Sequence, residues 1–177
     1  MQKFSFLVLL LLCSLWLTGQ PLAMPPTKEL PNDAASYQKE YAKRITKERL
    51  FGVYIPKNLD ESFVELDKKM AAQGKLKFQT MTESEVVGKV LLHRWLYQNW
   101  GFELGSRISH AIKTDFGVSF PDDAIDFILL SYHRKLLGKE LQTNELAAIY
   151  KEKRKKAWEE KQKKATVVEE GVRKKKE

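Results

Sequence analysis

The chain has 177 residues, 43% of them hydrophobic, and carries a formal net charge of +8 from 31 basic and 23 acidic residues. Its only cysteine is Cys13. The chain beyond Cys13 therefore offers no disulfide, no thiolate metal site and no cysteine nucleophile, and its length suits one ordinary domain with extensions.

The amino-terminal segment has the layout of a secretory signal. Lys3 precedes an apolar run from Phe4 to Leu17, and the small residue Ala23 follows it. This run is shorter than the roughly 20 apolar residues of a membrane-spanning helix. We predict a signal peptide over residues 1–23, cleaved between Gly19 and Met24, and hence a periplasmic or secreted protein. The alternative is a protein tethered to the membrane by an uncleaved signal.

The next segments combine prolines with weakly periodic apolar residues. Three prolines between Met24 and Pro31 predict a flexible leader over residues 24–36, and apolar residues three or four apart from Ala34 to Ile45 predict a helix. Asn58 and Glu61 stand at capping-box spacing and open a predicted helix over 59–71. Gln73 and Gly74 are expected to end that helix, with a connector over 75–80.

Two longer segments are apolar around most of a helical circumference. Thr82 and Glu85 form a second predicted capping box, which opens a helix that runs to Tyr97. A short helix should follow and end at Gly117. Pro121 then begins a helix that runs to Leu137. We expect these two apolar helices to be central in an all-α, small multi-helix domain over residues 37–142.

The basic excess lies in the tail. From Lys151 to Glu177 there are 12 bases and 6 acids, whereas Met24 to Tyr150 holds 18 and 17. We predict a basic helical tail over residues 143–177, which packs Leu146, Ile149 and Tyr150 before it becomes a solvated charged helix. Such a tail allows weak contact with an anionic surface. It lacks the basic-aromatic pattern of nucleic-acid binding.

Several spaced pieces of the sequence carry a resemblance to a known family. They are Ile55–Glu61, Met81–Glu85, His93–Phe102, Gly105–Arg107, Phe116–Val118, Pro121–Asp123 and Tyr132–Leu136. Together these pieces resemble a small bacterial family catalogued as a domain of unknown function (DUF6794-like), over roughly residues 54–141. The resemblance implies no activity, substrate or cofactor.

The candidate acid-base residues all fall inside this segment. His133 joins two other histidines, His93 and His110, but no two of the three have the spacing of a helical metal motif, so no metal site is expected. Asp122 and Asp123 are candidate bases, although their place after Pro121 is also explained by the helix dipole. A structural reading of the histidines, as packed or surface side chains, stays open.

The candidate binding residues surround an aromatic segment. Trp100, Asn99, Arg107 and Arg134 combine a flat apolar surface with hydrogen-bonding groups, as ligand pockets do, but aromatic residues at helical spacing also form plain core. Arg94 projects into the apolar arc of its helix. A buried guanidinium needs an acidic partner, and the sequence predicts an ion pair with Asp122 or Asp123.

No motif for a nucleophile, a phosphate loop or a cofactor is present. We therefore expect an exported, non-catalytic binding or interaction module of the cell envelope, which recognises a protein or another envelope component. The alternative is a small hydrolase-like envelope enzyme, with His133 or the pair Asp122 and Asp123 as acid-base groups and Arg107 or Arg134 holding an anionic substrate.

Overall fold

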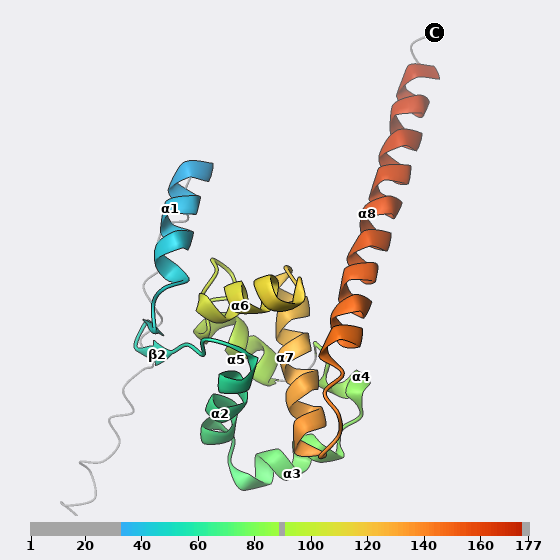
Figure 1. The fold of residues 1–177 in the computed structure, drawn as a ribbon. Coiled ribbons are helices and arrows are strands. Elements are labelled where there is room, and N and C mark those ends of the chain that lie inside the picture. Colours follow the sequence, from blue (N-terminus) through green and yellow to red (C-terminus); the bar gives the residue numbers. More distant parts are fainter. Residues whose placement is uncertain (1–32, 89–90, 175–177) are drawn as a thin grey trace, which may run out of the picture. The chain divides into compact units, whose positions relative to one another are not determined.

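The computed structural model describes residues 33–88 and 91–174, with side chains as far as Ala165. The predicted signal peptide, Cys13 and residues 24–32 of the predicted leader lie outside this part of the chain. The elements are α1 (Ala34–Arg44), β1 (Arg49–Leu50), β2 (Val53–Tyr54), α2 (Leu59–Lys69), α3 (Ala72–Thr80), α4 (Glu83–Val86), α5 (Leu91–Asn99), α6 (Arg107–Phe116), α7 (Pro121–Leu136) and α8 (Thr143–Lys174) (Figure 1). The all-α class is confirmed. Within the described residues, no helix has the length and apolar character to cross a membrane.

Helix α7 forms the centre of the core. Pro121 occupies its first turn with Asp122 and Asp123 behind it, and every residue from Asp123 to His133 is buried. Helices α2, α3, α4, α5, α6 and α8 all pack against it. Because all sides of α7 are covered, its sequence is apolar around the circumference, and the predicted central helix from Pro121 is confirmed.

The other predicted central helix is divided in two. The capping box of Thr82 and Glu85 is present, but α4 ends at Val86 and α5 begins at Leu91. Gly88 adopts φ +66, which breaks the helical ladder. Its N–H donates to the Asp126 carboxylate on α7 at 2.9 Å. A continuous helix from Thr82 to Tyr97 was therefore a wrong prediction, because a tertiary hydrogen bond stabilises the break.

The predicted connector over residues 75–80 is helical. Helix α3 runs through Gly74 to Thr80, and Phe78 is its buried residue. The Phe78 ring packs against Tyr132 and His133 of α7 at centroid distances of 6.0 and 5.5 Å. Burial of one aromatic ring thus offsets the helix-breaking preference of Gly74, which in isolation costs about 1 kcal/mol.

The amino-terminal part holds a short hairpin and helix α1. Strands β1 and β2 are antiparallel, and Arg49 is the register partner of Tyr54. Helix α1 begins at Ala34, within the predicted leader, and reaches the body through its last two turns. Arg44 Nε donates to the Gly105 carbonyl at 2.9 Å, and the Tyr41 hydroxyl lies 3.0 Å from His110 Nδ1.

Helix α8 begins in the core and continues beyond it (Figure 1). Leu146, Ala147 and Tyr150 are buried, whereas Ile149 is 61% exposed, contrary to its predicted packing role. From Lys151 to Ala165 every side chain is exposed except Arg154, which is half-buried. The predicted solvated charged helix is therefore observed over these residues.

Candidate functional site

His133 is sealed inside the helix packing. It is 2% exposed, its ring meets Phe78 edge-on, and neither ring nitrogen has a hydrogen-bond partner among the described residues. His93 and His110 lie on α5 and α6 with different neighbours. An imidazole enclosed in this way has no route to a substrate, so its position supports a packing role.

The predicted ion pair of Arg94 with Asp122 or Asp123 is not formed. Arg94 is exposed on α5. The buried Asp123 carboxylate instead accepts hydrogen bonds from Lys153 Nζ at 2.9 Å and from Arg154 Nε. Burial alone would raise the pKa of Asp123, but these two α8 cations hold the pKa below its ordinary value. Asp123 therefore fastens α8 to α7.

Asp122 is exposed and contributes to a different cluster. Its Oδ1 lies 3.9 Å from His93 Nε2, which is 3.5 Å from Asp126 Oδ1. Asp126 is buried, and burial raises its pKa above the ordinary value, while the Gly88 N–H and His93 act in the opposite direction. This cluster holds the α4–α5 break against α7. Among the described residues, no three or more His, Cys, Asp or Glu side chains are grouped so that they could hold a metal ion.

Three of the four predicted binding residues lie away from the open cleft of the molecule and have structural contacts. Trp100 is fully buried, and Asn99 Nδ2 donates to the Trp95 carbonyl at 2.9 Å. Arg134 donates hydrogen bonds to both carboxylate oxygens of Glu83, at 2.7 and 3.1 Å, and to the Leu141 carbonyl. The fourth residue, Arg107, lies beside an open cleft. The predicted site residues therefore do not converge on one cavity.

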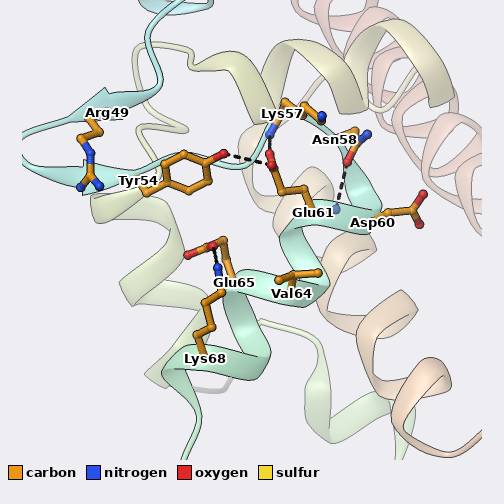
Figure 2. A pocket seen from close by; sticks show the side chains of 9 residues that line it. All are labelled: Arg49, Tyr54, Lys57, Asn58, Asp60, Glu61, Val64, Glu65 and Lys68. Atoms are coloured by element: carbon orange, nitrogen blue, oxygen red, sulfur yellow. Dashed lines mark hydrogen bonds and ion pairs between the residues drawn. The ribbon is translucent and has the colours of Figure 1, made fainter.

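An open cleft lies between the β1–β2 hairpin and α2. It has a volume of about 600 Å³. Figure 2 shows Tyr54 and Arg49 on the hairpin side, with Glu61 and Glu65 of α2 towards them and Asp60 pointing away from the hairpin. Its lining residues are Arg49, Tyr54, Lys57, Asn58, Asp60, Glu61, Val64, Glu65 and Lys68.

Glu61 organises the upper wall of this cleft. Its carboxylate accepts hydrogen bonds from the Tyr54 hydroxyl at 2.9 Å and from the Lys57 backbone N–H at 2.5 Å (Figure 2). Asn58 caps α2 by accepting from the Glu61 N–H at 2.9 Å. Burial would raise the pKa of Glu61, but the Lys57 N–H, the Tyr54 hydroxyl and Arg107 together lower it below the ordinary value. Glu61 is therefore ionised at neutral pH.

Arg107 contacts the Tyr54 ring through its guanidinium group. Its guanidinium carbon lies 4.9 Å from the ring centroid, and its Nε donates to the Ile55 carbonyl at 2.5 Å. Its Nη2 is 3.6 Å from Glu61 Oε2. The arrangement combines a cation–π contact with a charge-assisted network. One wall of the cleft is thus preorganised.

The cleft presents charges of both signs around a small apolar surface. Glu65 pairs with Lys68 at 2.7 Å, whereas no carboxylate among the described residues lies within ion-pair distance of Arg49 or Lys57. Val64 is 49% exposed between these groups. Such a surface can bind backbone amides and side chains of either charge.

From the sequence, Asn58 and Glu61 were predicted only to cap a helix, and this cleft was not predicted. The available signal was Val64, an apolar residue on the otherwise polar face that carries Asp60 and Lys68 four residues to either side. The position of Tyr54 opposite that face depends on the hairpin. Neither the hairpin register nor its contact with α2 can be read from residue spacing.

One stretch of sequence contains both the α2 side of the cleft and the central helix α7. Residues 55–136 match the family described as a domain of unknown function (DUF6794). The resemblance predicted from the sequence is thereby confirmed. The DUF6794 segment spans α2 to α7, a little under half of the chain, and leaves the hairpin and α8 outside. No curated protein and no solved structure matches the chain.

Proposed function

We propose that the protein is an exported, non-catalytic binding module of the cell envelope, and that the cleft between the hairpin and α2 holds a peptide segment of a partner protein. The observation that carries this proposal is the preorganised mixed-charge lining of the cleft. Small-molecule pockets are mostly apolar and enclosed. A cleft with three bases, three acids, a tyrosine and an exposed valine suits an extended peptide better.

The charged groups define how such a peptide would lie. Arg49 and Lys57 are exposed and can pair with a carboxylate of the partner, and Asp60, which is exposed on α2 and points away from the hairpin (Figure 2), can pair with a basic side chain. Tyr54 and Val64 between these charges favour a small apolar residue at the centre of the segment. The candidate acid-base groups support the non-catalytic part of the proposal, since His133 is enclosed and Asp123 is occupied by α8.

The test is site-specific photo-crosslinking in the producing cell. A photoreactive residue at Val64 is expected to capture a defined protein, whereas one at Leu76, an apolar position on α3 that is more exposed than Val64, is expected to capture none. The double variant Arg49→Glu with Lys57→Glu should abolish the product at Val64. Equal products at both positions, no product at Val64, or insensitivity to the charge reversal would refute the cleft as the recognition surface.

The export part of the proposal has a separate measurement. The amino-terminal sequence of the protein from the periplasmic or culture fraction is expected to begin between residues 20 and 24. An intact Met1 in the cytoplasmic fraction would contradict export. An intact Met1 in the membrane fraction would instead favour the tethered alternative.

A further inference from the structure

The charged residues of the projecting part of α8 are segregated by face. Successive residues turn by roughly 100° in an α-helix, so Lys151, Lys155 and Lys161 all fall within about 60° of Trp158. Glu152, Glu159 and Glu160, the acids between Lys151 and Ala165, all lie roughly 100° or more away from Trp158. The face centred on Trp158 thus carries lysines but no acid, together with the neutral residues Gln162 and Ala165.

This segregation is not what solvation alone produces. A solvated helix gains from oppositely charged residues interspersed at i and i+4, as Glu152 and Lys156 are on the far side at 3.8 Å. Of the three lysines around Trp158, only Lys155 has a carboxylate four residues on, Glu159, and the two side chains form no ion pair among the described residues. The indole is 63% exposed. The face therefore combines an excess of positive charge with an unburied aromatic ring.

The body of the protein extends this face at its base. Arg154 joins the face to the core through Asp123, and its guanidinium carbon lies 4.0 Å from the centroid of the Phe120 ring, which is 49% exposed. Beside them is a hollow of about 220 Å³, lined in part by Phe120, Lys151 and Arg154. Two exposed aromatic rings thus lie on the lysine side of α8, with Phe120 beside Arg154 and Lys151 and with Trp158 four residues after Arg154.

We infer that this surface, formed by Phe120 and the Trp158 face of α8, docks onto an anionic phospholipid membrane with α8 lying parallel to the bilayer. Tryptophan and lysine are the residues that favour the headgroup region, and a straight basic helix matches a flat negative surface. The attraction is electrostatic with one aromatic anchor, so it is reversible and weakened by salt. The inference uses residues outside the peptide cleft and does not depend on it.

The test compares two double variants of the full chain that change the net charge equally. Lys155→Glu with Lys161→Glu reverses charge on the Trp158 face, whereas Lys156→Glu with Lys163→Glu reverses it on the opposite face. Binding to vesicles of phosphatidylglycerol with phosphatidylcholine is measured by co-sedimentation, with phosphatidylcholine vesicles giving the charge-independent background. The first variant is expected to lose about tenfold or more in phosphatidylglycerol-dependent binding, and the second less than about threefold.

A second measurement reports the depth of the aromatic anchor. Bromine-labelled lipid in the same vesicles is expected to quench tryptophan fluorescence of the parent chain, and Trp158→Phe should remove most of that quenching. Equal loss of binding in the two double variants, or quenching unchanged in Trp158→Phe, would overturn the inference. It would also fail if polyglutamate bound with the same face dependence while phosphatidylglycerol vesicles did not bind, because that result would identify an acidic protein partner.

Discussion

Asp123 illustrates how the role of one side chain is decided by distant neighbours. Its place after Pro121 is enough to explain a carboxylate near the positive end of the α7 dipole. The structure adds Lys153 and Arg154, which approach from α8 and allow the carboxylate to be buried while ionised. The same two cations make Arg94 unnecessary as a partner.

The packing role of His133 predicts how its substitution changes the free energy of unfolding. Replacement by Ala would leave a cavity next to Phe78 and should lower the free energy of unfolding by about 2–4 kcal/mol. Replacement by Leu refills the space and removes two buried nitrogens that have no described partner, so its stability should lie within about 1 kcal/mol of the parent. Urea unfolding of both variants checks this. An Ala variant as stable as the parent would show that His133 is not a packing residue.

At the scale of elements, the Asp67 carboxylate joins three helices. From α2 it accepts hydrogen bonds from the Tyr132 hydroxyl at 2.8 Å and Lys135 Nζ at 2.9 Å, both on α7, and lies 3.2 Å from Lys75 Nζ on α3. The Lys135 hydrogen bond is the largest cause that lowers the pKa of Asp67 to about 2, and the Tyr132 and Lys75 bonds add to it against the opposing effect of burial. These contacts help to hold α3 in helical form beside α7.

This carboxylate should make the fold sensitive to acid. Its pKa is lower in the folded state than the ordinary 3.8 of the unfolded state, so its stabilisation is present above about pH 4 and is lost as the pH falls towards 2. Because the side chain is partly exposed, we expect only about 1 kcal/mol at neutral pH. Asp67→Asn should therefore lower the free energy of unfolding at pH 7 and have little effect near pH 2.

Urea unfolding of the parent and of Asp67→Asn across this pH range measures the effect. Asp115→Asn, which changes an exposed carboxylate on α6, serves as the control and should show no comparable pH dependence. A difference between parent and Asp67→Asn that is equally large at pH 2 and pH 7 would mean that the ionised carboxylate is not the stabilising form.

At the scale of the whole molecule, α8 has a first part that packs into the core and a second part whose side chains are exposed. Residues up to Arg154 complete the core, since Leu146, Ala147 and Tyr150 are buried and Asp123 receives its cations from this stretch. The side chains from Lys155 to Ala165 are exposed. The division separates the stabilising part of the helix from the part that we assign to membrane docking.

Two truncations distinguish these parts. Removal of residues 156–177 is expected to change the free energy of unfolding by less than about 1 kcal/mol, because it takes away no described buried side chain. Removal of residues 143–177 should cost roughly 5 kcal/mol or more, since it removes the buried Leu146, Ala147 and Tyr150 and exposes the apolar surface that they cover. Thermal unfolding of both truncated chains provides the measurement. A shorter truncation that melts as early as the longer one would contradict the division.

Local features of the sequence determined the ends of several helices. Asn58 before α2, Thr82 before α4, Gly117 after α6 and Pro121 at the start of α7 act through contacts with residues a few positions away, so spacing alone identifies them. The apolar circumference of α7 likewise predicted its central place. The family resemblance also followed from spaced pieces of sequence, and the DUF6794 match confirms it.

The tertiary structure decided what depends on long-range contacts. The break at Gly88 follows from its hydrogen bond to Asp126, and the helical form of α3 from the packing of Phe78 against α7. Asp123 receives its cations from α8 and not from Arg94. The cleft, in turn, requires the hairpin to place Tyr54 against Glu61. Periodicity and capping patterns describe a residue and its near neighbours, whereas each of these contacts joins elements that only the packing of the folded chain brings together.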